Sequence, residues 1–311
     1  MVAARQSENS GTALAAWVLV INALVWGLSW WPLRQLQGYG LHPLWASAVV
    51  YLAVFVVLLA MYFKNLRDFM QHPLLWALAI ATGLTNIGFN WAVTVGDVVR
   101  VVLLFYLMPA WSVLVAWAVL GEKPSVASLL RLALAMAGVL LVLKTPESAW
   151  PIPQGGADWL ALMGGFSFAV TNALLRKARY APTGARMLAM FGGGAVMASA
   201  AALLGMSQQV VSSPALLPGS TGAALLVLAG LTLAFFISNM ALQFSAARLA
   251  ASTTSLVMLT EILFASASAA ALGAAEFSPR ILLGGSLIVL AAVLAALATA
   301  SGNAGAATEA K

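Results

Sequence analysis

The 311-residue chain contains no cysteine and only two histidines, and charged residues make up just 8% of it. The absence of cysteine excludes disulfides, thiolate metal sites and a cysteine nucleophile. The shortage of charge excludes an ordinary water-soluble domain, in which about a quarter of the residues are charged. Hydrophobic residues instead make up 62% of the chain, which is typical of a protein that lies in lipid.

Ten apolar stretches follow one another along the chain, each about as long as the roughly 20 helical residues that cross a bilayer. Strict alternation of apolar and polar residues is not found, so helices are favoured over a β-barrel. The sequence therefore predicts an all-α integral membrane protein with ten transmembrane helices. We place the spans at 14–33, 42–63, 74–95, 99–120, 126–143, 157–177, 184–205, 222–244, 249–272 and 279–300.

The last five spans weakly repeat the first five in the same order. Gly83-Leu84-Thr85 in the third span corresponds to Gly230-Leu231-Thr232 in the eighth, and an asparagine follows each. Because five is an odd number, the second copy enters from the opposite side, as in the 5+5 inverted repeats of alternating-access transporters. The predicted units are a polar N-terminal tail (1–13), a first five-helix repeat (14–143), a linker (144–156), a second five-helix repeat (157–300) and a polar C-terminal tail (301–311), both tails being expected to be disordered.

Lysine and arginine are distributed unevenly between the two sides of this predicted bundle. The positive-inside rule assigns the richer side to the cytoplasm, so both termini are expected there, in the cytoplasmic membrane. The richer side holds Arg5, Lys64, Arg67, Lys123, Arg131, Arg176, Lys177, Arg179, Arg186, Arg248 and Lys311. The poorer side holds Arg34, Arg100, Lys144 and Arg280.

A motif in the fourth span resembles a known family. Tyr106-Leu107-Met108-Pro109, followed by Gly121-Glu122, is similar to the pattern of the drug/metabolite transporter superfamily, EamA type, in which a proline precedes a Gly-Glu pair by twelve residues. The second repeat has Glu261 at the proline position and Gly273 twelve residues later, but its next acid is displaced to Glu276. The resemblance implies a ten-helix exporter of small metabolites, closest to bacterial aromatic amino-acid exporters.

Glu261 is the most informative single residue, because a carboxyl group near the middle of a span costs about 2.5–3.5 kcal/mol to insert. One interpretation is that it binds a substrate ammonium group or a coupling proton, since burial favours protonation. The other is that it is a neutral carboxylic acid, hydrogen-bonded between helices. By contrast, Glu122 and Lys123 are interpreted as a solvated turn, in which Glu122 caps a helix end.

Amide and deep aromatic side chains could line a cavity around Glu261, although each could also serve only to join or pack helices. Pro109 interrupts the fourth span and is predicted to act as a gating hinge or as a static bend. The predicted substrate-binding set is Asn22, Trp26, Trp30, Asn86, Asn90, Trp91, Tyr106, Asn172, Asn239, Gln243 and Glu261.

These features predict an alternating-access transporter that exports small metabolites, most simply amino acids with aromatic or apolar side chains, passively or coupled to protons. No motif for catalysis, a cofactor, a metal or nucleic acid is found, so the expected partners are a small-molecule substrate and the lipid bilayer. The alternatives are a drug, nucleotide-sugar or other metabolite transporter on the same fold and, more remotely, a membrane sensor or an intramembrane enzyme.

Overall fold

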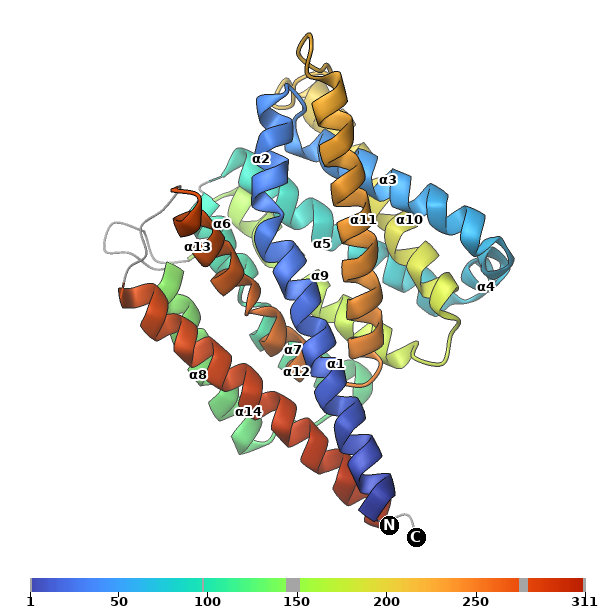
Figure 1. Cartoon of the computed structure of the whole chain (residues 1–311), viewed down its shortest axis with the longest axis vertical. Helices are drawn as coiled ribbons and strands as arrows, with labels where there is room; N and C mark the ends of the chain where they lie inside the picture. The colour runs from blue at the N-terminus through green and yellow to red at the C-terminus, as the bar shows by residue number, and fades with distance from the viewer. Residues whose placement is uncertain (1, 97, 144–151, 274–278, 310–311) are drawn as a thin grey trace.

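The computed structural model describes residues 2–96, 98–143, 152–273 and 279–309, and the described chain is helical in each of the ten predicted spans, with no strand (Figure 1). Much of the predicted linker, Lys144 and Glu276 lie outside these residues. The helices are α1 (Val2–Leu28), α2 (Trp30–Gly38), α3 (Pro43–Met61), η1 (Phe63–Asn65), α4 (Leu66–Gln71), α5 (Pro73–Val95), α6 (Val98–Phe105), α7 (Met108–Val115), η2 (Ala116–Leu120), α8 (Val126–Leu143), α9 (Gly156–Lys177), α10 (Thr183–Ser207), α11 (Thr221–Ala246), α12 (Ala251–Met258), α13 (Glu261–Ala271) and α14 (Pro279–Glu309).

Helix boundaries follow from local chemistry. Proline is the first residue of α3, α5 and α14, where its missing N–H is not needed. The fourth and ninth spans both end at a glycine with positive φ, Gly121 at +71° and Gly273 at +67°. These are the two glycines that the sequence pairs across the repeat, and a residue with a Cβ would be strained at either position.

Nine of the ten predicted spans are helices long and apolar enough to cross a membrane. The tenth, α5, has 23 residues and is also long enough, at 1.5 Å per residue, to cross a hydrocarbon core about 30 Å thick. It does not meet the same criterion of composition, because Thr82, Thr85, Asn86 and Asn90 interrupt its apolar residues. The predicted span that falls short of this criterion is therefore the one that carries three of the predicted site residues, Asn86, Asn90 and Trp91.

The prediction of disordered tails is wrong for the described residues. Helix α1 begins at Val2 and α14 continues to Glu309, so both tails prolong the terminal helices. Each tail prolongs a helix that has already formed and needs no nucleus of its own, which the polar composition alone did not indicate. Helix α1 packs against α14, and their outer ends lie together at the bottom of Figure 1.

Glycine allows several helices to approach closely. Gly88 of α5 lies against Gly164 of α9, where a Cβ on Gly88 would come within 2.6 Å of the Gly164 backbone. Gly138 of α8 and Gly284 of α14 face each other in the same way, and Figure 1 shows α8 and α14 side by side. Such contacts replace the hydrophobic driving force that lipid removes between helices.

Connections expected on the same side of the membrane contact one another. On one side, Leu217 N–H donates to Tyr39 O at 2.9 Å and Trp45 Nε1 donates to Ser212 O at 3.0 Å. On the other, Gly184 lies against the ring of Tyr62. This grouping agrees with helices that cross alternately.

Candidate functional site

Two spans are broken near their centres, at corresponding places in the predicted repeats. The fourth span consists of α6 and α7, separated at Tyr106 and Leu107, and the ninth of α12 and α13, separated at Leu259 and Thr260. The segment before each break has eight residues. Helix α7 packs against α12, so the two broken spans lie next to each other. Broken helices of this kind commonly build binding sites near the membrane midplane.

Tyr106 and Glu261 join the two breaks. The Tyr106 hydroxyl donates to Glu261 Oε1 at 2.6 Å, although the residues are 155 positions apart. Tyr106 is buried and Glu261, the first residue of α13, is half-buried. A carboxylate in the first turn of a helix is also favoured by the helix dipole. Among the described residues, Glu261 Oε2 has no hydrogen-bond partner, so one oxygen can receive a further donor.

Helix α1 covers the start of α13 on one side. A Cβ on Gly27 would lie 2.5 Å from the carbonyl oxygen of Glu261, so only glycine permits this approach. The neighbouring Trp26 packs against Phe235 with ring centroids 4.7 Å apart. On the side of α6, the ring centroid of Phe105 lies 5.9 Å from that of Tyr106 and 6.3 Å from that of Phe168. Aromatic rings therefore lie next to both members of the Tyr106–Glu261 pair.

A second polar group joins α1 to α11. Asn22, which is 1% exposed, donates through Nδ2 to both the carbonyl oxygen and the hydroxyl of Ser238 at 2.7 Å. On the same helix as Ser238, Gln243 Nε2 donates to Asn239 Oδ1 at 2.8 Å, and both amides contact Met190 Sδ. Three predicted site residues are thus brought to the α1, α10 and α11 interface.

A third polar group lies where α9 meets the broken spans. Asn172, fully buried on α9, donates to Ser255 Oγ of α12 at 3.4 Å. The Ser255 hydroxyl also contacts that of Ser112 on α7. Asn172 is therefore held between both broken spans, close to their crossing.

Other predicted residues lie in different surroundings. Asn86 donates to Thr82 O of its own helix at 3.1 Å, and Asn90 donates to Ser47 Oγ of α3 at 3.3 Å. Trp30 Nε1 donates to Ser268 Oγ of α13 at 3.0 Å, seven residues beyond Glu261. Trp91 packs against a separate apolar cluster, formed by Leu44, Ala201, Ala202 and Val211.

Pro109 is buried as the second residue of α7, directly after the break. Its missing N–H leaves the carbonyl of Phe105, four residues earlier, without the usual helical donor. Gly165 of α9 packs against that carbonyl, and a Cβ there would lie 2.5 Å from the Phe105 oxygen. The break thus has a cause in α7 and a supporting surface on α9.

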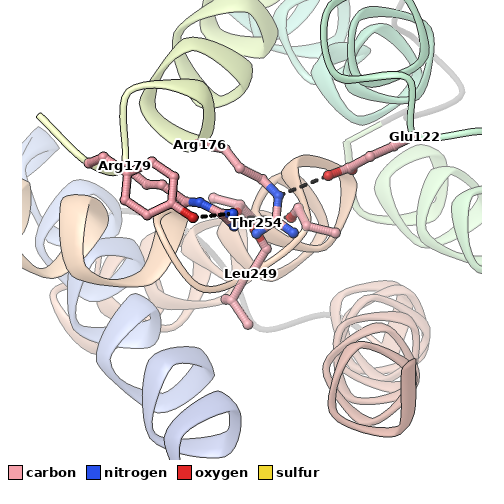
Figure 2. A network of polar contacts seen from close by, with 7 residues as sticks. Glu122, Arg176, Arg179, Leu249 and Thr254 are labelled. Atoms are coloured by element: carbon pink, nitrogen blue, oxygen red, sulfur yellow. Dashed lines mark hydrogen bonds and ion pairs between the residues drawn. The ribbon is translucent and has the colours of Figure 1, made fainter. Parts of the chain in front are cut away.

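Ion pairs fasten the fourth span to α9 at both of its ends. Arg100 Nε lies 2.9 Å from Asp158 Oδ2 at one end, and Arg176 Nε lies 2.8 Å from Glu122 Oε1 at the other. Arg176 Nη1 also donates to Leu249 O at 2.6 Å, just before α12. Figure 2 shows Arg176 in this position, with Glu122 on one side and Leu249 on the other.

This network corrects one interpretation of the sequence. Glu122 lies in an irregular and largely exposed segment, but its side chain is 31% exposed and forms an ion pair with Arg176, which the interpretation as a solvated turn did not include. The spacing of charges along the chain gave no signal for the pair, since the partners are 54 positions apart. Nor could the sequence identify Ser238 and Ser255, which have the ordinary appearance of small membrane residues.

An apolar groove lies apart from these polar groups. The groove of about 520 Å³ lies between α13 and α14, lined by residues such as Leu263, Ile281 and Gly285, and it contains no predicted site residue. Within the described part of the chain, no group of three or more His, Asp or Glu side chains could hold a metal ion.

Comparison with known proteins agrees with this architecture. Residues 13–144 match the EamA-like transporter family. A search of the curated proteins found no match. Among solved structures 22 chains match, and one, described only as the crystal structure of a protein, has a TM-score of 0.73 and 17% identity over 92% of this chain and 98% of its own. At that identity the likeness shows the fold alone.

Fold and sequence together define a multi-pass membrane transporter. The domain at 13–144 is of the EamA type, which confirms the predicted resemblance to the drug/metabolite transporter superfamily. Members of that family are transporters, so the domain at 13–144 is that of an EamA-type membrane transporter.

Proposed function

We propose that the protein exports amino acids with aromatic or apolar side chains by alternating access. The observation that carries the proposal is the contact between Tyr106 and Glu261 at the adjoining breaks of two spans. A carboxylate in a largely apolar bundle is costly and is retained where it binds or moves a charge. Its second oxygen supplies an acceptor for a substrate ammonium group.

The atoms left unpaired in the interior favour a ligand that donates hydrogen bonds. Asn22 Oδ1, Asn172 Oδ1 and Gln243 Oε1 are buried and have no partner among the described residues. These oxygens are acceptors, and a buried acceptor without a donor costs about 1–3 kcal/mol. The ammonium group of an amino acid is a donor of the kind that these oxygens and Glu261 accept. Its carboxylate would be met by amide N–H groups or by half-helix N–H groups.

The surrounding rings favour an apolar or aromatic side chain. Phe105 and Phe168 lie next to Tyr106, and Trp26 and Phe235 stack across α1 and α11. Such walls bind a flat ring through offset or edge-to-face contacts. A nucleotide sugar would instead require deep cationic side chains for its phosphates, and Lys and Arg are rare within the predicted spans.

Helix packing supports the inverted repeat that alternating access requires. In the predicted repeat, α1 corresponds to α9, α3 to α10, α5 to α11 and α8 to α14, and the fourth span (α6 and α7) corresponds to the ninth (α12 and α13). The α5–α9 contact then has its counterpart in the α11–α1 contact, and the α7–α9 contact has its counterpart in the contacts of α1 with α12 and α13. The α3–α10 and α8–α14 contacts are converted into themselves, and the fourth span contacts the ninth, its own counterpart, through α7 and α12. This is the pattern of two copies related by a two-fold axis in the membrane plane.

Transport in this scheme opens one end at a time. The Arg100–Asp158 pair closes one end of the contact between the fourth span and α9, and the Glu122–Arg176 pair closes the other. We place the protein in the cytoplasmic membrane with both termini in the cytoplasm. The Glu122–Arg176 pair then forms the closure on the cytoplasmic side. Either a substrate gradient or protonation of Glu261 drives the cycle.

Counterflow in proteoliposomes tests the proposal. Vesicles preloaded with unlabelled phenylalanine should take up labelled phenylalanine, and preloading with methionine should support uptake better than preloading with threonine or a nucleotide sugar. Glu261→Gln should lose this exchange, whereas Asp68→Asn, a change of the same kind outside the spans, should retain it.

Each outcome separates the hypotheses. Exchange of another solute, with amino acids inactive, would keep the transporter and reject the amino-acid substrate. Exchange that Glu261→Gln leaves unchanged in rate and in pH dependence would reject the site. Chemical conversion of the solute, followed by mass spectrometry, would support the membrane enzyme instead.

A further inference from the structure

The N-terminus of α10 carries an arginine that lacks a counter-charge. Arg186, in the first turn of α10, is only 5% exposed. Its Nε and Nη1 atoms are buried and have no hydrogen-bond partner among the described residues. A buried guanidinium without an anion is among the most costly arrangements in a protein.

The backbone around Arg186 adds to the unpaired positive charge. Pro182 is the N-cap of α10, and no side chain caps the helix, so the N–H groups of Thr183, Gly184 and Ala185 lack helical acceptors. Arg186 Nη2 donates to Thr183 Oγ1 at 3.1 Å, which places the guanidinium over this first turn. The helix dipole gives the same end a partial positive charge, which favours a bound anion.

Neighbouring charged groups do not neutralise Arg186. The charged group that influences it is another cation, the exposed Arg248, whose guanidinium lies 3.7 Å from the ring centroid of Phe244 and donates through Nη1 to Phe244 O at 2.8 Å. On the segment between α3 and α5, the Asp68 carboxylate accepts from Asn65 Nδ2 at 3.0 Å and forms no ion pair with Arg186. The two ion pairs of the described residues involve Arg100 and Arg176.

The position of Arg186 in the membrane indicates the chemical class of the anion. Arg186 lies at the end of a span, and α10 packs against α4. The exposed Arg67 belongs to α4, and the exposed Lys64 belongs to η1, directly before it. This is the level at which lipid phosphates meet a membrane protein, and basic pockets between helices commonly bind lipid head groups there. Arginine in particular binds a phosphate through two parallel hydrogen bonds.

We propose that the N-terminus of α10, with Arg186 and Arg248, is a binding site for a phosphate oxyanion, carried by an anionic membrane lipid or free in solution. The oxyanion accepts hydrogen bonds from the N–H groups of Gly184 and Ala185 and from the Arg186 guanidinium. This site is separate from Glu261 and does not depend on the identity of the transported solute.

Thermal unfolding of the purified full-length protein, followed by tryptophan fluorescence, tests the site. In mixed micelles, phosphatidylglycerol at about 100 times its Kd should raise Tm by about 5 °C more than phosphatidylcholine does. Arg186→Gln should abolish this difference and Arg248→Gln should reduce it. Arg34→Gln, which changes an exposed arginine of α2, should leave it intact.

Two further measurements complete the test. Inorganic phosphate that raises Tm in wild type, but not in Arg186→Gln, would assign the site to the free anion and support the oxyanion chemistry equally. Arg186→Lys keeps the charge and should retain part of the shift, which covers the case in which Arg186→Gln does not fold. The proposal would be overturned if both lipids shifted Tm equally and phosphate had no effect. It would also be overturned if the shifts were the same in wild type, in both Arg186 variants and in Arg248→Gln.

Discussion

The hydroxyl of Tyr106 and the carboxylate of Glu261 meet at 2.6 Å, one at the break of the fourth span and the other directly after the break of the ninth. Their contact joins the two predicted repeats at the place where helical backbone is interrupted. A movement that separates α6 from α13 must break this hydrogen bond, which links the state of the carboxylate to the arrangement of the helices.

Tyr106→Phe removes the hydroxyl and keeps the ring. Because a hydrogen bond to a charged group contributes about 1.5–3 kcal/mol, we expect counterflow to slow by about tenfold or more. Tyr62→Phe, at the end of α3 and away from the breaks, is the matched control. Equal rates in wild type and Tyr106→Phe would show that the contact has no part in transport.

The contacts of Arg176 predict unequal effects of removing the two ends of its ion pair. Glu122→Gln should lower stability by less than about 1 kcal/mol, because the pair is partly exposed. Arg176→Gln should cost about 1–3 kcal/mol, because the carbonyl of the buried Leu249 loses its donor as well. Thermal unfolding of the two variants gives the comparison. A larger loss of stability in Glu122→Gln than in Arg176→Gln would contradict the prediction that the contact with Leu249 adds to the ion pair.

Gly165 predicts a steric limit at the break. A Cβ there would lie 2.5 Å from the Phe105 carbonyl oxygen, so Gly165→Ala should destabilise by about 1–3 kcal/mol through forced separation of α9 from α6. Gly230→Ala is the control, because a Cβ at that position meets no atom within 4 Å. Alanine favours helix over glycine, and Tm of the control should be unchanged or slightly higher. Similar losses in both variants would exclude the close approach as the cause.

His42 predicts a pH dependence of stability. Its Nδ1 accepts from Leu44 N–H at 3.2 Å as the N-cap of α3, and burial lowers the pKa of His42 from 6.5. The unfolded chain therefore binds the proton more readily, so the contribution to stability is complete above about pH 6.5 and is lost as the pH falls through the folded pKa.

An asparagine at the N-cap keeps the acceptor and cannot be protonated. The slope of Tm between pH 7.5 and 5 should consequently be smaller in His42→Asn than in wild type. His72→Asn, at a position whose side chain does not cap α5, should retain the wild-type slope. Parallel slopes for wild type and His42→Asn would rule out the cap as the source.

Hydrophobic length and proline position predicted the helices well, because both act locally along the chain. Nine predicted spans meet the membrane criterion, and Val126–Leu143 was predicted to the residue. The helical tails were missed because low hydrophobicity was interpreted as disorder. The 5+5 repeat stays a prediction, which the contacts between helices support.

The site was less accessible to sequence reasoning, because its contacts join residues far apart. Glu261 and Tyr106 were both predicted from their positions within spans, but only the packing of α7 on α12 shows that they meet. Trp91 was grouped with them by residue type, yet it faces a different cluster. The roles of the predicted residues in substrate binding stay predictions until transport is measured.

The two outer helices end together, with α1 and α14 in contact. Proteins whose ends are neighbours commonly tolerate circular permutation. A chain that starts at Gly156, passes through α14 into α1 by a short added linker and ends at Leu143 would keep each helix–helix contact described above. In this permuted chain the second repeat would be synthesised before the first. Insertion of the second repeat into the membrane could then be measured before the first repeat is present.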